Sequence, residues 1–363
     1  MAREKRQEVE FDLESFNFAE LSSDVFGNAV TTAKLNPDLQ GKIFAIYGEN
    51  NTGKTTQAAK MVQNSFLIPA EQGANALGKG TQILKTSGWA DIRKHTRTLT
   101  TNKKLLAALQ AGITIGVIID GIDNLPLFIK QYVSDQAGVE KFQKAGSHGG
   151  QWEDYSNEMF WFVTKLTQVG YTLFFIGHPH ESKSEPGLLD LIDDKRVAKP
   201  IKNVCDFVIY LEDNGSDEEN NVVRSSAYLT THKPTEDAYG FFARSRFPYV
   251  QTFFEEWDAE VVRQAIYDGI VKQAEVEGAE LVGFAEVSEK YETTFDLSFD
   301  DAMDSIYEML DTCDEKGLGE TADDILLAYI DSPDDIKNLT KRQMQTVQAI
   351  YDELVDLLAN IEE

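Results

Sequence analysis

The sequence predicts an α/β fold, a mostly parallel β-sheet flanked by helices, followed by an acidic helical domain. From Lys42 onward, short apolar runs alternate with helix-compatible stretches, as in parallel sheets that are buried on both faces. The first run leads into a glycine-rich loop and then a helix, the context in which a phosphate-binding loop is credible. Beyond Trp257 the pattern changes to amphipathic helices rich in Asp and Glu.

The chain has 363 residues, enough for two domains and a large buried core. We divide it into three parts from these changes of pattern. Residues 1–40 form an N-terminal arm or cap, residues 41–254 the α/β core, and residues 255–363 an acidic, mainly helical C-terminal domain.

The net charge of −27 is concentrated at the C-terminal end. Residues 255–363 hold 30 Asp and Glu but only 7 Lys and Arg, a net charge of −23. Such a domain does not bind nucleic acid directly. It is suited to shielding a nucleic-acid site, mimicking DNA or docking on basic proteins, and simple solubility is the alternative.

No run of about 18 apolar residues is present, so we expect no membrane span. Residues 1–6 lead into acidic residues rather than an apolar stretch, so we also expect no signal peptide. Cys205 and Cys313 lie far apart and have no metal-ligand spacing. We expect free thiols in a reducing, cytoplasmic compartment.

Five short apolar runs, most of them rich in β-branched or aromatic residues, are the expected strands of the parallel sheet. They are residues 43–47, 66–70, 114–119, 171–177 and 207–211. Residues 225–231 and 239–244 are expected to form an antiparallel pair at the edge of the sheet.

Three amphipathic helices are expected after Trp257, at residues 259–273, 299–313 and 340–360. Ser298 with Asp301 marks the start of the second, and Thr340 with Gln343 forms a capping box at the start of the third. The apolar stripe of the third helix is expected to pack in a core; a docking or oligomerisation face is the alternative. The stripe consists of Met344, Val347, Ile350, Leu354, Leu357, Leu358 and Ile361.

The loop after the first strand is a complete G-x-x-x-x-G-K-[ST] motif. Its glycines let backbone N–H groups turn toward an oligophosphate, and the following helix adds positive partial charge. Lys54 is expected to neutralise the β- and γ-phosphates of ATP, and Thr55 to place its hydroxyl on Mg²⁺. The nucleotide-binding residues are Gly48, Glu49, Asn50, Asn51, Thr52, Gly53, Lys54, Thr55 and Thr56.

Two carboxylates end apolar strands. Asp120 follows residues 114–119, and at the end of a parallel strand next to the phosphate-binding strand it is suited to holding Mg²⁺ through water. Asp123 follows on the same loop. Glu71 ends the strand at residues 66–70, where it is placed to orient or deprotonate the attacking water. The alternative for Asp120 and Asp123 is a plain strand cap, and the alternative for Glu71 is an ordinary solvated loop residue.

Together these features resemble the RecA-like ATPases, most closely the phage-encoded RecA-core proteins of single-strand annealing and recombination. The resemblance covers roughly residues 41–250 and implies a RecA-type fold. Four motifs carry it in order: the Walker A motif at residues 48–55, the Ala70-Glu71 strand end with residues 73–77 behind it, residues 119–125, and residues 174–178.

The resemblance implies roles for individual residues. Glu71 would activate water, and His178 would sense the γ-phosphate, although bacterial recombinases have Gln there and a longer segment between Lys54 and Glu71. A structural histidine is the alternative for His178. Arg244 and Arg246, shortly before Pro248, match a pair of basic residues that reach ATP in the neighbouring subunit, so a homo-oligomer with ATP at its interfaces is implied. Two surface arginines are the alternative.

The resemblance also implies that two segments, 134–152 and 181–202, hold single-stranded DNA. Their basic residues would neutralise phosphates and Trp152 would stack on a base. Several Asp and Glu dilute the charge, so contacts with other subunits are the alternative. The basic residues and glycines are Lys141, Lys144, His148, Gly149, Gly150, Lys183, Lys195, Arg196, Lys199 and Lys202.

The function expected from the sequence is a Mg²⁺-ATP-dependent ATPase that binds single-stranded DNA in phage homologous recombination or strand annealing. Phage origin would place it in the cytoplasm of the host cell. The alternative is an ATP-switched assembly or loader protein of DNA replication whose acidic domain docks on a basic replication or recombination protein. A small-molecule kinase is disfavoured because no Arg-rich lid is present.

Overall fold

The computed structural model describes residues 32–71, 81–146, 149–216, 218–219, 223–288 and 297–359, together with 17–19, 22 and 25. The chain divides into two compact units, Met1–Lys290 and Tyr291–Glu363. Most of the expected N-terminal arm lies outside the described residues.

The core of the first unit is one β-sheet. Six strands run parallel in the order β9-β2-β6-β5-β3-β4. All five expected strands are present and parallel, so the predicted mostly parallel α/β fold is confirmed. The strands are β2 (Ile43–Gly48), β3 (Ser65–Pro69), β4 (Thr81–Ile83), β5 (Gly116–Asp120), β6 (Thr172–Gly177) and β9 (Phe207–Glu212).

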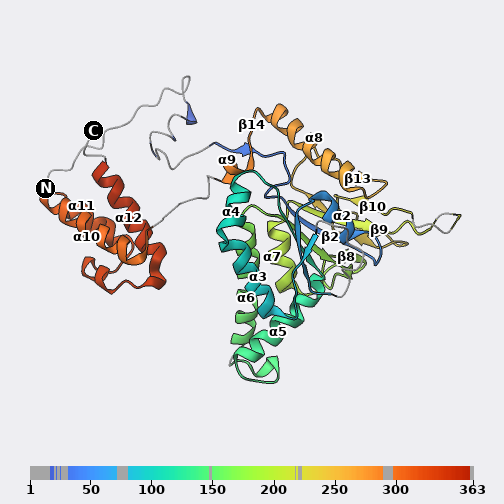
Figure 1. Cartoon of the computed structure of the whole chain (residues 1–363), viewed down its shortest axis with the longest axis horizontal. Helices are drawn as coiled ribbons and strands as arrows, with labels where there is room; N and C mark the ends of the chain where they lie inside the picture. Colours follow the sequence, from blue (N-terminus) through green and yellow to red (C-terminus); the bar gives the residue numbers. More distant parts are fainter. Residues whose placement is uncertain are drawn as a thin grey trace. The chain divides into compact units, whose positions relative to one another are not determined.

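Side chains alternate between the two faces of the sheet, and helices cover both faces. On β2, Phe44 and Ile46 pack on one side with α2 (Lys54–Met61) and α8 (Ala259–Glu277). Ala45 and Tyr47 pack on the other side. Five helices cover that second face (Figure 1): α3 (Trp89–Thr101), α4 (Lys103–Gln110), α5 (Leu125–Gln136), α6 (Gly150–Thr167) and α7 (Lys195–Val204).

The expected antiparallel pair at residues 225–231 and 239–244 forms only at one end. There His232, one residue beyond the first segment, and Phe241 exchange backbone hydrogen bonds in an isolated antiparallel bridge. β10 (Ser226–Tyr228) instead pairs antiparallel with β9 and with β13 (Phe253–Phe254). β12 (Arg244–Ser245) pairs with β9 further back. Apolar alternation identified the strands but not their partners, because the pairing depends on which strand edges are free. The remaining strands are β11 (Gly240–Phe241) with β8 (Leu188–Asp190) and β7 (His180–Glu181), and β1 (Lys34–Leu35) with β14 (Glu280–Leu281).

The boundary between the units differs from the one drawn after residue 254. Trp257 is 1% exposed, and it packs with Val262 and Ile266 of α8 in the apolar cluster beneath α2. The expected helix at residues 259–273 therefore exists but belongs to the sheet-containing unit, which continues through α9 (Phe284–Ser288).

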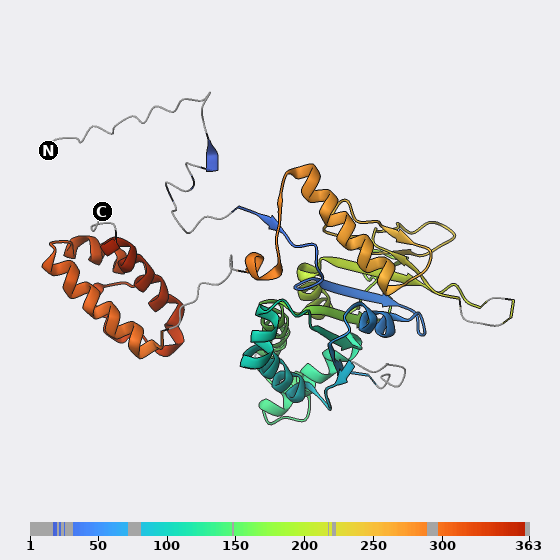
Figure 2. The ribbon, with the colours of Figure 1, turned by 45° about the horizontal axis from the view of Figure 1, so that its top comes forward.

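The second unit is a small helical bundle with its own core (Figure 2). Val347, Ile350 and Leu354 are fully buried there, so the apolar stripe of the last helix packs in a core, as expected. The predicted capping box of Thr340 and Gln343 is present. The elements are α10 (Phe299–Glu315), α11 (Gly319–Leu327), η6 (Pro333–Asn338), η7 (Lys341–Gln343) and α12 (Met344–Ala359).

No helix among the described residues is long and apolar enough to cross a membrane. Cys205 and Cys313 are both free and buried.

Candidate ATP-hydrolysis site

The phosphate-binding loop connects the end of β2 to the start of α2. Asn51 and Gly53 both take left-handed backbone conformations, with φ of 67° and 80°. Gly53 then precedes the first turn of α2, which contains Thr55 and Thr56. The loop thereby turns the unpaired N–H groups and the positive end of the helix toward one small space, as an anion-binding loop requires.

Lys54 lies folded back over this loop. Its Nζ donates hydrogen bonds to the carbonyl oxygens of Gly48 at 2.8 Å and Glu49 at 2.7 Å. Burial lowers the pKa of Lys54, while the nearby carboxylates of Asp120 and Glu49 oppose that shift. Thr52 Oγ1 also donates to Glu49 O, at 2.9 Å, and closes the loop. The ammonium group is therefore held inside the loop, where phosphate oxygens would replace the two carbonyls.

Thr55 and Asp120 are in contact, although the strand before the phosphate-binding loop, β2, and the strand that ends at Asp120, β5, are not neighbours. Thr55 Oγ1 donates to Asp120 Oδ2 at 2.9 Å. We expected Asp120 on a strand next to β2, but β6 lies between β2 and β5. Burial raises the pKa of Asp120, and the hydrogen bond from Thr55 and the charge of Lys54 oppose that rise. A hydroxyl beside a carboxylate fits Mg²⁺, which takes oxygen ligands.

Glu71 follows β3, which pairs with β5 rather than with β2. It lies directly over Gly121, whose φ is 88°; a Cβ at Gly121 would lie 2.3 Å from Glu71 Cγ. Asn124, in the turn η3 (Ile122–Asn124), donates from Nδ2 to the carbonyl oxygen of Ala70 at 3.1 Å and fixes this strand end. Burial raises the pKa of Glu71, and His178 opposes the rise.

Asp123 joins two histidines after β6. His178 Nδ1 lies 3.1 Å from Asp123 Oδ2, and His180 Nε2 lies 2.7 Å from Asp123 Oδ1. On its other side, His178 Nε2 is 3.0 Å from Asn50 Oδ1 of the phosphate-binding loop. His178 Nδ1 is also 3.9 Å from Glu71 Oε1. The sensor position is thus linked to the loop, to Glu71 and to His180.

These contacts set the protonation of the group. The hydrogen bond to Asp123 raises the pKa of His178. Burial opposes ionisation of Asp123, but the hydrogen bonds from His178 and His180 outweigh it and lower its pKa. Glu71, Asp123 and His178 offer ligand atoms within 4.8 Å of one another, so a second cation could also be held here.

The sequence indicated no role for His180, and for Asp123 it left two roles open, a metal contact and a strand cap. The pattern His178-Pro179-His180 after an apolar strand was the available signal. Alternate residues of an extended chain point the same way, so the two imidazoles can reach one carboxylate.

Arg244 and Arg246 lie away from this group. Arg244 pairs with Val208 and Arg246 follows beside Asp206, near the amino ends of β9 and β2, whereas the phosphate-binding loop is at the carboxyl end. Arg244 Nη2 donates to the carbonyl oxygens of Lys202 at 2.5 Å and Cys205 at 3.1 Å. Arg246 donates to the carbonyl oxygen of Asn203. Within one chain, both arginines satisfy the C-terminal carbonyls of α7.

The two segments expected to be DNA-binding loops both contain regular structure. In residues 134–152, α5 extends to Gln136, the 3₁₀ turn η4 (Phe142–Lys144) follows, and α6 starts at Gly150. Residues 181–202 contain the end of β7, all of β8 and most of α7. Trp152 is half-buried in α6, with Phe142 at 4.8 Å and the Arg196 guanidinium 4.3 Å over its ring. His148 and residues 73–77 lie outside the described residues.

A pocket of about 540 Å³ adjoins His180 and Asp123. Its cations are partly neutralised, since Lys183 pairs with Asp193 at 2.5 Å and Lys130 lies 3.9 Å from Asp194. The lining residues are Asp123, Pro126, Lys130, Trp152, His180, Lys183, Ile192, Asp193, Asp194, Lys195 and Arg196.

Comparison with known proteins bears on this site. Residues 40–247 match the model of a family described as an AAA domain. The chain is 33% identical over 339 residues to the SPbeta prophage-derived uncharacterized protein YorG of Bacillus subtilis (strain 168), across 93% of this chain and 100% of the relative. A solved chain from a study of a prototypical ATPase from the type III secretion system of pathogenic bacteria has a TM-score of 0.33 and 13% identity, across 47% of this chain and 51% of that one.

Proposed function

Because this chain belongs to the AAA domain family, we propose that it is a Mg²⁺-dependent ATPase that binds single-stranded DNA in phage recombination or strand annealing. The family match supports nucleotide binding and hydrolysis at a general level. The DNA substrate is the finer step, and the prophage origin of the relative is consistent with it.

One observation gives the main support for the proposed ATPase activity. Lys54, the Thr55–Asp120 pair and Glu71 all lie at the carboxyl edge of the sheet, beside the phosphate-binding loop. Lys54 would neutralise the β- and γ-phosphates of ATP. Thr55 and Asp120 would hold Mg²⁺, which would offset the charge of those phosphates. Glu71 would accept a proton from the attacking water at its carboxylate, giving ADP and phosphate.

His178 would report on this reaction. Its Nε2 faces Asn50 in the loop, and a γ-phosphate oxygen would take over that hydrogen bond. Its Nδ1 is held by Asp123, which also holds His180 at the edge of the pocket containing Lys195 and Arg196. These hydrogen bonds, together with the 3.9 Å contact between His178 Nδ1 and Glu71 Oε1, offer a route by which DNA at the pocket would change the position of Glu71.

We further propose a homo-oligomer with ATP at its interfaces, in which Arg244 and Arg246 act on the neighbouring subunit. The test mixes each Arg→Ala protein with Lys54→Ala protein. Restored turnover through mixed interfaces would support the role in trans. No rescue at any ratio, with mixed assembly verified, would leave the arginines as caps of α7.

The deciding experiment measures the ATPase rate with and without single-stranded DNA while oligomer size is followed by light scattering. We expect DNA to stimulate turnover and to promote assembly. Lys54→Ala is the control, and turnover should fall by about two orders of magnitude or more because a charge that faces the phosphates is lost. An ATPase rate that does not change with DNA would contradict the proposed role in recombination or annealing, but the ATPase activity itself would stand.

The alternative is an ATP-switched loader of DNA replication that docks through its acidic residues on a basic replication or recombination protein. The separate, acidic second unit with its own core favours this reading. ATP-dependent capture of such a protein, with no response to DNA, would support it.

A further inference from the structure

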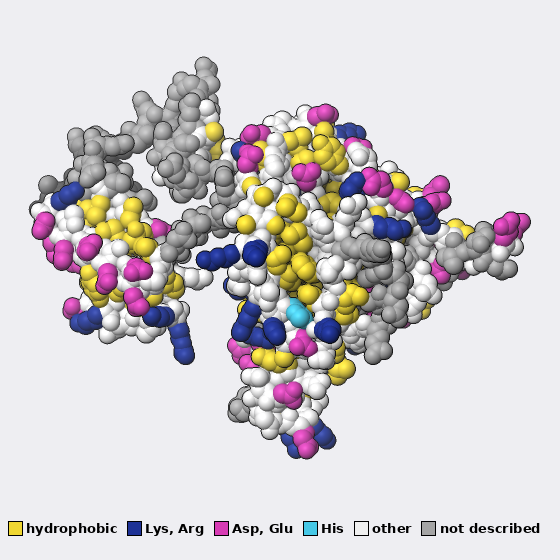
Figure 3. Space-filling model, in the orientation of Figure 1, with side chains coloured by type: hydrophobic (Ala, Val, Ile, Leu, Met, Phe, Trp, Pro, Cys, Tyr) yellow, Lys and Arg dark blue, Asp and Glu magenta, His cyan; other side chains and the backbone are white. Residues whose placement is uncertain are grey.

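The outer face of α3 is basic in an otherwise acidic protein. Residues 85–104 contain six Lys and Arg and one acidic residue, Asp91, while the whole chain carries −27. The Asp91 carboxylate is already occupied, since it accepts hydrogen bonds from Ser87 N at 2.8 Å and Ser87 Oγ at 2.6 Å. Figure 3 shows Lys and Arg side chains gathered on the face formed by α3 and α4.

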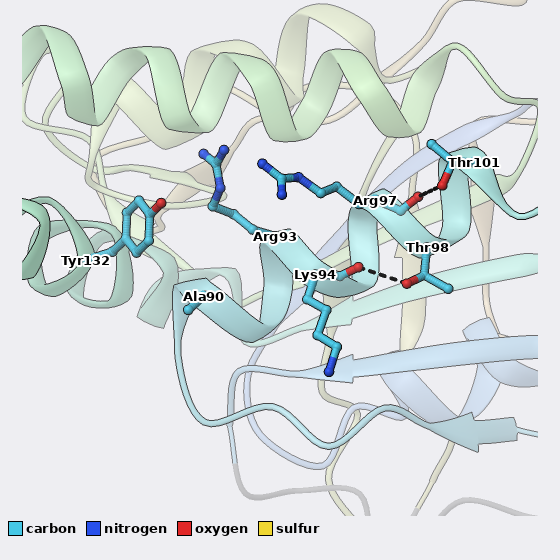
Figure 4. A pocket seen from close by; sticks show the side chains of 7 residues that line it. All are labelled: Ala90, Arg93, Lys94, Arg97, Thr98, Thr101 and Tyr132. Carbon is cyan, nitrogen blue, oxygen red and sulfur yellow. Dashed lines mark hydrogen bonds between the residues drawn. The ribbon is translucent and has the colours of Figure 1, made fainter.

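A hollow of about 360 Å³ lies along this face, and no carboxylate lines it. It follows one side of α3, opposite the side that buries Trp89, Ile92 and Leu99. Figure 4 shows Arg93 and Arg97 reaching to the same side of the helix. The lining residues are Ala90, Arg93, Lys94, Arg97, Thr98, Thr101 and Tyr132.

The Arg93 side chain is held by contacts with α6, whereas the side chains of Lys94 and Arg97 are not held in this way. Glu158 accepts hydrogen bonds from Arg93 and from Trp89 Nε1, and the Arg93 guanidinium lies 4.5 Å from the centre of the Trp161 ring. Among the described residues, Lys94 and Arg97 form no ion pair. The charge of Lys94 acts on the nearby Asp91 carboxylate. Lys94 and Arg97 lie three positions apart, so their like charges repel one another, and a bound anion would relieve that repulsion.

We propose that the outer face of α3 binds the phosphate backbone of single-stranded nucleic acid, at a site separate from the pocket beside His180. This deepens the proposed function and rests on it. Residues 93 and 97 are one helical turn apart, about 6 Å. Lys103 and Lys104, at the start of α4, add two further cations just beyond the end of α3, and we call these residues together the basic track.

This track suits a linear polyanion, and its chemistry favours phosphate. Guanidinium groups bind phosphate oxygens through two parallel N–H donors. The Thr98 and Thr101 hydroxyls already donate to backbone carbonyl oxygens of Lys94 and Arg97, so the cations carry the interaction. The pocket beside His180 differs, because Asp193 and Asp194 neutralise cations there.

The test uses the full chain and fluorescence anisotropy with a 20-nucleotide oligothymidylate over a range of salt concentrations. We expect Lys94→Ala/Arg97→Ala to weaken binding on the order of 25-fold at 0.1 M salt, since each lost contact removes about 0.7 from the salt slope. Arg263→Ala/Lys272→Ala on α8 removes the same charge from the opposite face of the sheet and should bind as the unmodified protein does. Thermal unfolding checks that both variants are folded.

Unchanged affinity and salt slope in the α3 variant would overturn the α3 site and leave DNA binding by the pocket beside His180 intact. Equal loss in both double variants would also overturn it, because general charge would then be responsible. Competition by poly-glutamate as strong as that of the oligonucleotide would assign the face to an acidic polypeptide instead. If the unmodified protein bound no oligonucleotide, the proposed DNA function itself would fail.

Discussion

The ATP site contains three carboxylates, on Glu71, Asp120 and Asp123, and each has a different environment. Burial raises the pKa values of Glu71 and Asp120, whereas two imidazoles lower that of Asp123. Carboxylates whose environments separate their pKa values tend to take separate roles. We therefore propose that Asp123, whose pKa alone of the three is lowered, positions both histidines. The contact with Thr55 favours Asp120 for the metal, which leaves proton transfer to Glu71.

Glu71→Gln should keep ATP binding and lose turnover by about 10²-fold or more, because it removes a base and preserves the shape. Single-turnover hydrolysis and binding of a fluorescent ATP analogue measure the two properties separately. If this variant hydrolysed ATP at the normal rate, another residue would have to be the base, and Asp123 would be the first candidate to test.

The pH dependence of turnover follows from the same group. Glu71 acts as a base only when ionised, and its pKa is raised, so turnover should fall on acidification at a pH above the ordinary Glu range. His178 opposes that rise, so in His178→Gln the pKa of Glu71 should increase further and the acidic limb should move to higher pH. A kcat profile against pH measures this, and an unmoved limb would separate His178 from Glu71.

At the scale of elements, the turn between β5 and η3 positions the base. Gly121→Ala strains a left-handed residue by about 1 kcal/mol and pushes its Cβ into Glu71. We expect turnover to fall by about 10²-fold with ATP binding retained, since a displacement of about 1 Å is costly in catalysis. Gly112→Ala is the matched control, because its φ is 81° but nothing lies within 4 Å of its Cβ. Equal turnover in the two variants would refute the steric role.

The C-terminal end of α7 gives a second prediction at this scale. Arg244→Ala leaves two carbonyl oxygens without their charged donor, so we expect a loss of about 1–3 kcal/mol in the free energy of unfolding. Urea denaturation at dilute concentration measures this without contribution from assembly. Arg263→Ala, which breaks an exposed pair with Glu260, should cost less than about 1 kcal/mol. A native-like stability for Arg244→Ala would favour a role only in trans.

At the scale of the whole molecule, α8 is part of the ATPase unit. A chain ending at residue 254 loses Trp257, Val262 and Ile266 from the cluster beneath α2, and removal of one buried Trp side chain alone costs about 3–5 kcal/mol. Because domains are stable by only about 5–15 kcal/mol, fragment 1–254 should not fold cooperatively, whereas fragment 1–290 should. Calorimetry of both fragments measures this. Cooperative unfolding of fragment 1–254 would restore the earlier boundary.

The sequence by itself determined the parallel strands, the phosphate-binding loop and the capping box at Thr340. Each is written in neighbouring residues: apolar runs bounded by turns, a fixed eight-residue motif, and two side chains three positions apart. Such local signals specify the kind of element, because backbone hydrogen bonding and burial depend on periodicity over a few residues.

Only the tertiary structure decided which elements and side chains are in contact with one another. The strand order put β6 between Asp120 and the loop, the turn at Gly121 made room for Glu71, and one carboxylate of Asp123 joined two histidines. It also placed Arg244 at the end of α7 and α8 on the sheet. These contacts join residues far apart in the chain, and they form through competition among strand edges and apolar faces that no local pattern encodes.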